Sequence, residues 1–235
     1  MPLQRLLFCT TAGLLLAAGC GQSPDSLLQS ASIKYEGGDY RGAIADCSKA
    51  IRQNPNRAEA YVWRGRARAR SGDADGAIGD LDEAIRLNPR TPEAYCNRSV
   101  AWQQKGDHES AIRDATEAIR LNPRDFEAYY NRGTSRGVLG DYAGSVADLT
   151  EAIRLNPHDD PECYCNRGIT YERQGQSKEA IADFTKAIGL RADYAKAYFH
   201  RYVLRERLGD YAGAAADSNQ VRRINPGAFT AKAKP

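Results

Sequence analysis

The stretch Ala58–Thr91 reads AEAYVWRGRARARSGDADGAIGDLDEAIRLNPRT, and the stretch that follows, Pro92–Asp125, reads PEAYCNRSVAWQQKGDHESAIRDATEAIRLNPRD. Both stretches are 34 residues long, and the residues Tyr61, Gly72, Ala77, Ala84 and Pro89 of the first recur at the same places in the second. A period of this length is typical of supersecondary units that cannot bury their apolar faces alone and therefore stack on copies of themselves. The period predicts a repeat architecture and points toward binding of partners.

The same period continues on both sides of these stretches and defines six units. A glycine recurs at one position of every unit, at 38, 72, 106, 140, 175 and 209. The units are 24–57, 58–91, 92–125, 126–160, 161–194 and 195–228, and the fourth has one extra residue. Outside them we expect a signal peptide over 1–19, a short linker over 20–23 and a disordered tail over 229–235.

Each unit has the pattern of two helices joined by a tight turn. In the second unit, small and apolar residues recur at helical spacing from Tyr61 onward. Gly72 provides the left-handed conformation that ends a first helix, and Asp73 or Asp75 provides the N-cap of the second. Pro89 ends the second helix, because the residue before a proline is pushed out of the α region.

These positions resemble the tetratricopeptide-repeat family, which has a period of 34 residues. The resemblance implies an all-α fold: an α-solenoid of six helix–turn–helix repeats forming a right-handed superhelix, with the first helices lining its concave face. The last unit departs from the pattern, with Tyr202 at a small-residue position and Val221 at an alanine position. Residues 227–235 are too few for the extra helix that usually covers the last repeat. We therefore expect the last helix to be exposed or covered by a partner.

The N-terminus has the pattern of an export signal. Arg5 precedes an apolar run, Leu6–Ala18, which is too short to span a bilayer. The run ends in Leu-Ala-Ala-Gly-Cys, which resembles a bacterial lipobox with Cys20 as the acylated residue, although an alanine stands where leucine is more usual. The alternative is an ordinary secretory signal cleaved after small residues. Because Gly21 follows Cys20, resemblance to known sorting rules favours the outer membrane, facing the periplasm.

Composition and motifs exclude several other functions. The net charge of +3 is small, and no nucleic-acid-binding motif is present. No GxSxG, HExxH or glycine-rich phosphate loop occurs, so we expect neither an enzyme nor a small-molecule substrate. The three histidines fall in different units, and the spacing of the cysteines favours free thiols, so we expect no metal and no cofactor.

An arginine and an aspartate recur together through the units. The arginines are Arg64, Arg98, Arg132, Arg167 and Arg201, and the aspartates are Asp46, Asp80, Asp114, Asp148, Asp183 and Asp217. Arginine on a first helix and aspartate on a second would form charge-assisted hydrogen bonds. The alternatives are a charged binding surface and a structural pair that fixes helix register. We favour the structural pair, because a ligand-binding surface would vary along the solenoid.

Positions that vary between units are better candidates for binding. By resemblance, two positions of each first helix line the concave groove, and they make it mainly apolar with an aromatic end, which suits a peptide with apolar side chains. With Arg70 added from a basic stripe on the second unit, the candidate groove residues are Val62, Arg66, Arg70, Cys96, Val100, Tyr130, Thr134, Cys165, Ile169, Phe199 and Val203. The stripe favours either an acidic partner or plain solvation; we favour the latter.

Some members of the family hold the C-terminal carboxylates of chaperones with a clamp of lysines and asparagines. Asn97 occupies a clamp-like position here, but the companion basic positions hold Glu93, Glu127 and Glu162, which would repel a carboxylate. We therefore exclude that ligand.

The sequence thus predicts a membrane-anchored periplasmic scaffold or adaptor that binds proteins or peptides in its concave groove. The first alternative is an assembly factor for an outer-membrane machine, similar to the pilotins of type IV pili. The second is a hydrolase with a hidden site. The repeat pattern alone separates neither alternative from the scaffold.

Overall fold

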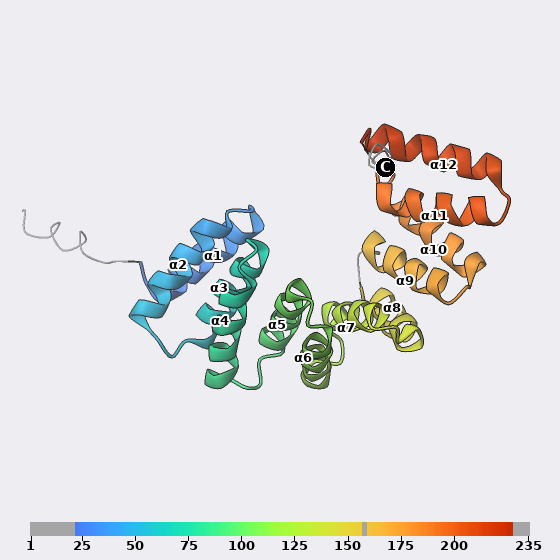
Figure 1. The fold of residues 1–235 in the computed structure, drawn as a ribbon. Coiled ribbons are helices and arrows are strands. Elements are labelled where there is room, and N and C mark those ends of the chain that lie inside the picture. The colour runs from blue at the N-terminus through green and yellow to red at the C-terminus, as the bar shows by residue number, and fades with distance from the viewer. Residues whose placement is uncertain (1–21, 157–158, 228–235) are drawn as a thin grey trace, which may run out of the picture.

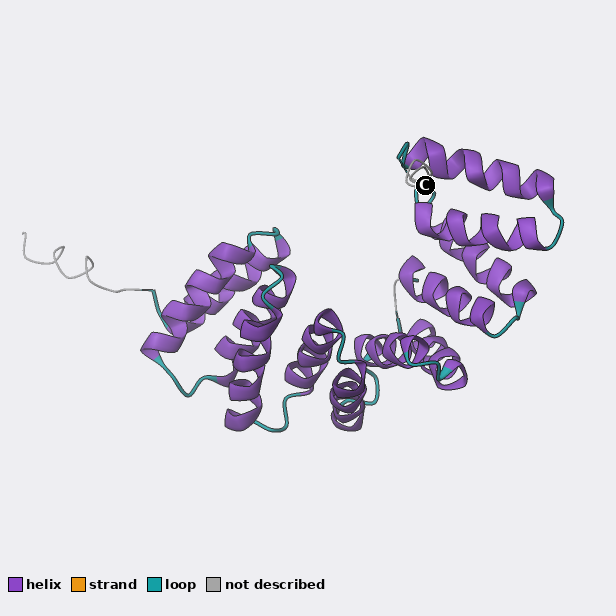
Figure 2. Cartoon of the chain, in the orientation of Figure 1, coloured by secondary structure: helices purple, strands orange, loops and turns teal. Residues whose placement is uncertain are grey.

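The computed structural model describes residues 22–156 and 159–227, and within them every regular element is an α-helix (Figure 2). Twelve helices form six pairs in this part of the chain, as the sequence predicted. They are α1 (Pro24–Glu36), α2 (Tyr40–Gln53), α3 (Ala58–Arg70), α4 (Ala74–Leu87), α5 (Pro92–Lys105), α6 (His108–Leu121), α7 (Phe126–Val138), α8 (Tyr142–Leu155), α9 (Pro161–Arg173), α10 (Ser177–Leu190), α11 (Ala195–Arg207) and α12 (Tyr211–Ile224).

The helix pairs follow one another along a curved superhelix (Figure 1). Each pair packs on the next through its second helix, and the first helices of neighbouring pairs also contact one another. Among the described residues, the second helices of neighbouring pairs make no such contact. The first helices are therefore crowded on the inner side of the curve, and the second helices are spread on the outer side.

Glycines and aspartates set the turns within the pairs. All six recurring glycines have φ between 78° and 88°, the left-handed conformation that a helix end of this kind requires. The second helix of five pairs is capped by an aspartate that accepts a hydrogen bond from the amide three residues on. In the second unit the capping residue is Asp73; Asp75 instead pairs with Lys105.

Small residues allow the two helices of a pair to approach closely. A Cβ added at Gly65 would lie 2.7 Å from Leu81 Cγ, and one added at Gly133 would lie 2.9 Å from Leu149 Cγ. The last pair reverses the sizes, with Tyr202 at the small position and Ser218 at the large one. The large Tyr202 that departs from the repeat pattern is thus accommodated by a small residue, Ser218, on the facing helix.

The helix α12 ends the stack, and its outward face is polar enough to be solvated. The five earlier second helices carry isoleucine or valine at one position of this face and isoleucine at another, whereas α12 carries Ala215 and Arg222 there, both exposed. We expected this helix to be exposed or covered by a partner, and among the described residues only α11 packs on it. A polar outer face is what a terminal repeat needs to meet water.

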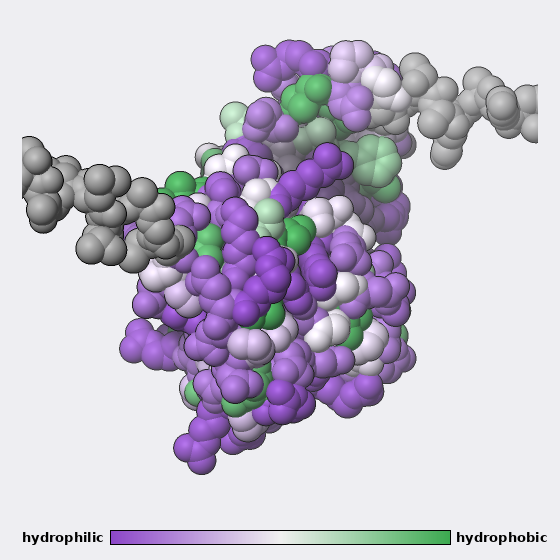
Figure 3. Space-filling view, turned by 90° about the vertical axis from the view of Figure 1, so that its left-hand side faces the viewer, coloured by the Kyte–Doolittle hydropathy of each residue, from purple (hydrophilic) through white to green (hydrophobic). Residues whose placement is uncertain are grey.

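The predicted signal peptide, the acylated Cys20 and the C-terminal tail lie outside the described residues. None of the described helices is sufficiently long and apolar to cross a membrane. The face seen in Figure 3, on the side of α1 and α2, is mostly hydrophilic with scattered hydrophobic residues.

Candidate protein-binding groove

The recurring arginines and aspartates are paired, as predicted. Arg64 donates from Nε and Nη2 to the two carboxylate oxygens of Asp80, at 2.9 and 2.6 Å. The same two-bond geometry joins Arg98 to Asp114, Arg132 to Asp148, Arg167 to Asp183 and Arg201 to Asp217. The first unit has no such arginine, and there Asp46 accepts from Ser30, Lys34 and Lys49.

Each of these arginines also reaches across a unit boundary. Its Nη1 donates to the second helix of the preceding unit, at Ser48, Asp82, Thr116, Thr150 and Thr185 in turn. The aspartates are buried, with 2–7% of their surface exposed, so a partner on the surface has little access to them. These contacts join three helices at every boundary and support a structural role for the pairs.

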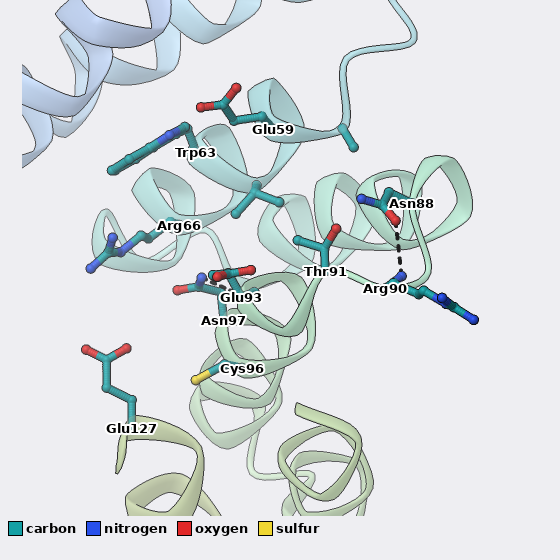
Figure 4. Close-up of a pocket in the computed structure, with 12 residues that line it drawn as sticks. Glu59, Trp63, Arg66, Asn88, Arg90, Thr91, Glu93, Cys96, Asn97 and Glu127 are labelled. Carbon is teal, nitrogen blue, oxygen red and sulfur yellow. Dashed lines mark hydrogen bonds between the residues drawn. The ribbon is translucent and has the colours of Figure 1, made fainter. Parts of the chain in front are cut away.

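The first half of the concave face contains a pocket of ≈ 540 Å³ between α3, α5 and the start of α7 (Figure 4). Three of the predicted groove residues line it. Together with residues that the groove prediction missed, its lining includes Val62, Trp63, Arg66, Glu93, Cys96 and Glu127. We call this the groove pocket. It combines an apolar wall with charged groups, which is the composition of many recognition sites.

Most of the predicted basic stripe is neutralised within the protein. Arg57 pairs with Asp25 and Glu59, while Arg64 and Arg68 pair with Asp80. The other two arginines of the stripe, Arg66 and Arg70, interact with aromatic side chains. The guanidinium of Arg66 lies 4.6 Å from the ring centre of Tyr35 and 5.4 Å from that of Trp63, and Arg70 donates to the Tyr35 hydroxyl.

In the second half of the face, the equivalent positions are filled by side chains. Cys165 was predicted to line the groove, but its side chain is completely buried in a cluster with Phe184, Tyr194 and Leu204. The prediction that Cys165 lines the groove is therefore corrected, because Tyr194 and its neighbours cover the thiol. Ile169 packs partly buried against the same cluster.

The other predicted groove residues differ in accessibility. Tyr130 is half-buried, its hydroxyl accepts a hydrogen bond from Asn166 at 2.8 Å, and burial raises its pKa. Thr134 is half-buried and its hydroxyl has no hydrogen-bond partner among the described residues. Phe199 is 41% exposed. Val100 and Val203 are half-buried.

The cysteines are free thiols, as the sequence predicted, but one of them lies beside two carboxylates. The four described cysteines are free and buried, and burial raises the pKa of the Cys47 and Cys163 thiols to about 12. One group of potential metal ligands exists in the described part of the chain: Cys96, Asp125 and Glu127 each bring one ligand atom within 4.8 Å of the others. The prediction of no metal did not consider this group, because its members belong to two different units.

The stacked helix pairs and the recessed inner face define an all-α solenoid of helix–turn–helix repeats with a pocket on its concave side. Comparison with sequence families matches the description "Tetratricopeptide repeat" over residues 28–92, 101–160 and 161–194. The chain therefore belongs to the tetratricopeptide-repeat family, as its resemblance implied. No curated protein matches it significantly.

Solved structures show the same fold at low identity. The Cut9–Hcn1 hetero-tetramer of APC/C matches with a TM-score of 0.80 and 17% identity over 88% of this chain, which spans only 41% of that one. PilW, described as a widely conserved type IV pilus biogenesis factor, matches with a TM-score of 0.79 and 19% identity over 88% of this chain and 96% of its own. YrrB, described as having an unusual peptide-binding site, matches with a TM-score of 0.61 and 20% identity over 77% of this chain and 92% of its own.

Proposed function

We propose that this protein is a scaffold of the bacterial cell envelope that binds a segment of a partner protein in its concave groove. The observation that carries the proposal is the groove pocket, which is recessed and has an apolar wall beside charged groups. Tetratricopeptide repeats are protein-interaction modules, and the peptide-binding site of YrrB supports the same role for this fold.

The proposed location rests on the sequence of the N-terminus. Residues 16–20 resemble a lipobox, so Cys20 would be acylated and would hold the repeats at the membrane, facing the periplasm. More than one acyl chain is needed for stable anchoring. The test is fractionation of cells with and without Cys20→Ala. The proposal expects the variant either to leave the membrane fraction or to stay there at its longer precursor length, whereas a variant of mature length that stays in the membrane fraction would contradict a lipid anchor.

A second candidate is an assembly factor for type IV pili. The observation that favours it is the match to PilW, which covers nearly the whole of both chains. The two candidates differ in partner: the assembly factor would bind a pilus or secretin subunit, and the adaptor would bind envelope enzymes such as cell-wall hydrolases or proteases.

The test of both is crosslinking and pull-down from membranes, followed by mass spectrometry, with wild type and Asn97→Arg. Asn97 lines the groove pocket, and among the described residues its side chain bonds only to the backbone of its own helix, so arginine there would obstruct the pocket while leaving the core intact. The matched control is Ala147→Arg, on an exposed position of α8. A partner lost only with Asn97→Arg supports the groove. A partner kept by both variants would place binding elsewhere.

A further inference from the structure

Acidic side chains converge at the groove pocket. One carboxylate oxygen of Asp125, one of Glu127 and the sulfur of Cys96 lie within 4.8 Å of one another, and Glu93 is a further carboxylate in the pocket lining. Asp125 accepts a backbone hydrogen bond from Ala128 at the start of α7. Burial raises the pKa of Asp125, and the negative charge of Glu93 adds to the effect. Asp125 is thus a partly buried carboxylate beside the pocket, whereas Glu93 and Glu127 are exposed carboxylates of its lining.

The pocket glutamates Glu93 and Glu127 form no ion pair within the described part of the chain, although Arg70 lies near enough to Glu127 to interact with it electrostatically. Glu59, Glu93, Glu127 and Glu162 occupy the same position of four successive first helices. Glu59 pairs with Arg57, and Glu162 pairs with Arg191. Glu93 and Glu127 form neither an ion pair nor a side-chain hydrogen bond among the described residues. The two middle carboxylates thus stay available to a ligand, while the outer two are neutralised.

The arginines near the pocket leave this charge in excess. Arg66 is held over the rings of Tyr35 and Trp63. Figure 4 shows Arg90 on the opposite side of the pocket, pointing away from Glu93 and Glu127. Arg66 and Arg70 are the cations that interact with this group, and against the three carboxylates of Glu93, Asp125 and Glu127 they leave a negative local charge.

We propose that the groove pocket receives a basic side chain, lysine or arginine, from an extended segment of the partner. Its cation would lie between the carboxylates of Asp125 and Glu127, and its aliphatic stem would lie against Val62 and Trp63. A cationic nitrogen makes hydrogen bonds of about 2.8 Å to carboxylates, so one nitrogen can bridge two oxygens separated by up to roughly 5.6 Å. The observed convergence within 4.8 Å fits this arrangement.

A metal ion fits the same cluster less well. Burial and the charges of Asp125 and Glu127 raise the pKa of Cys96 well above its usual value, and a neutral thiol is a poor metal ligand. One oxygen of Asp125 is already used in capping α7. The apolar wall formed by Val62 and Trp63 would also have no role with a bare ion, whereas long basic side chains bury their stems along such surfaces.

This inference rests on the proposed binding function, and the experiment separates the two. Random short peptides displayed on phage are selected on the immobilised full chain, and the best peptide is synthesised with its basic residue and with norleucine in its place. Binding is measured by fluorescence anisotropy to wild type, Asp125→Asn, Glu127→Gln and Asn97→Arg. Asparagine keeps the N-cap of α7. The matched control is Glu109→Gln, which changes an exposed glutamate in the first turn of α6.

We expect the selected peptides to share a lysine or arginine. Asp125→Asn, Glu127→Gln and the norleucine peptide should each bind about tenfold more weakly, since a charge-assisted bond is lost, and Glu109→Gln should bind as wild type does. The peptide and protein changes should not add, because they remove the same interaction.

Four results would overturn the inference. Selected peptides without a basic residue, or equal binding to Glu127→Gln, would exclude a cation at this cluster. If Asn97→Arg abolished binding of peptides that lack a basic residue, the groove would remain the binding site and only this inference would fail. If Asn97→Arg left their binding unchanged, the proposed function would fail as well. Stoichiometric Zn²⁺ binding that is abolished by Cys96→Ser and displaces the peptide would assign the cluster to a metal instead. Failure to select any peptide would also count against the inference.

Discussion

Cys96 and Cys165 stand at the same position of the third and fifth units, yet their surroundings differ. The residue that precedes the next unit's first helix lies beside each thiol: Asp125 beside Cys96 and Tyr194 beside Cys165. Tyr194 is 7% exposed, its hydroxyl donates to Glu162, and Arg191 lies 4.6 Å from its ring centre. An aromatic side chain thus packs on the thiol in the second half, where an aspartate lies beside it in the first.

The comparison shows how one repeat frame carries two kinds of surface. The arginine–aspartate pairs run through units two to six without change, so they do not distinguish the halves. The difference lies in the short connections between units, where framework contacts are few and residues vary. Loops on a fixed scaffold are a common place for function, and here the connecting residue beside the buried thiol is an aspartate in the first half and a tyrosine in the second.

The largest effect on stability should follow from removing the Tyr194 side chain, which packs in the second half of the concave face. Tyr194→Ala removes a buried ring that covers Cys165, and we expect the free energy of unfolding to fall by about 3 kcal/mol, as for other large-to-small changes in a core. Urea unfolding followed by circular dichroism measures it. Tyr211→Ala, at a position that is 73% exposed, is the control and should change stability little. Equal effects would mean that Tyr194 does not fill the second half.

Loss of the arginine from an arginine–aspartate pair should lower stability equally in the two halves, provided that no second arginine binds the same aspartate. Arg98→Leu and Arg167→Leu each leave a buried aspartate without its bidentate partner, and we expect each to lower the free energy of unfolding by about 3 kcal/mol. Arg132→Leu should cost less, about 1 kcal/mol, because Arg136 still donates to Asp148. Chemical unfolding of the three variants tests this order; equal losses would show that the second arginine is unimportant.

Filling the open half should remove binding. Asp125→Tyr places in the first half the residue type that closes the second, and we expect at least about tenfold weaker binding of the selected peptide. Fluorescence anisotropy measures the change, and circular dichroism checks that helix content is kept. Undiminished binding by a folded Asp125→Tyr protein would contradict the role given to this position.

A smaller effect concerns pH. The pKa of Asp125 is raised by burial and by Glu93, so the folded protein binds this proton more tightly than the unfolded chain does. Stability should therefore decrease as pH rises from the ordinary carboxyl pKa through the raised one. Asp125→Asn, which keeps the cap, should be slightly more stable than wild type at neutral pH, and the gain should vanish in acid. Urea titrations at several pH values test this, and a gain that persists in acid would exclude Asp125 as the cause.

The sequence predicted the framework because the framework recurs. The glycine turns, the capping aspartates and the pairing of Arg64 with Asp80 repeat in register, so one unit explains the others. The groove was predicted less well. The burial of Cys165 depends on Tyr194, which is the last residue of the same unit and lies outside the helices. Contacts made by such a connecting residue, whose type varies from unit to unit, leave no periodic signal.

The most direct test uses photo-crosslinking at equivalent positions of the two halves. Asn97 and Asn166 occupy the same place in the third and fifth units; the first lines the groove pocket, whereas the second is bonded to Tyr130 and Lys196. A photoreactive amino acid is introduced at each position in the full-length protein in living cells. We predict a partner adduct at position 97 and none at position 166. An adduct confined to position 166, or equal adducts at both, would contradict a binding site in the first half of the groove.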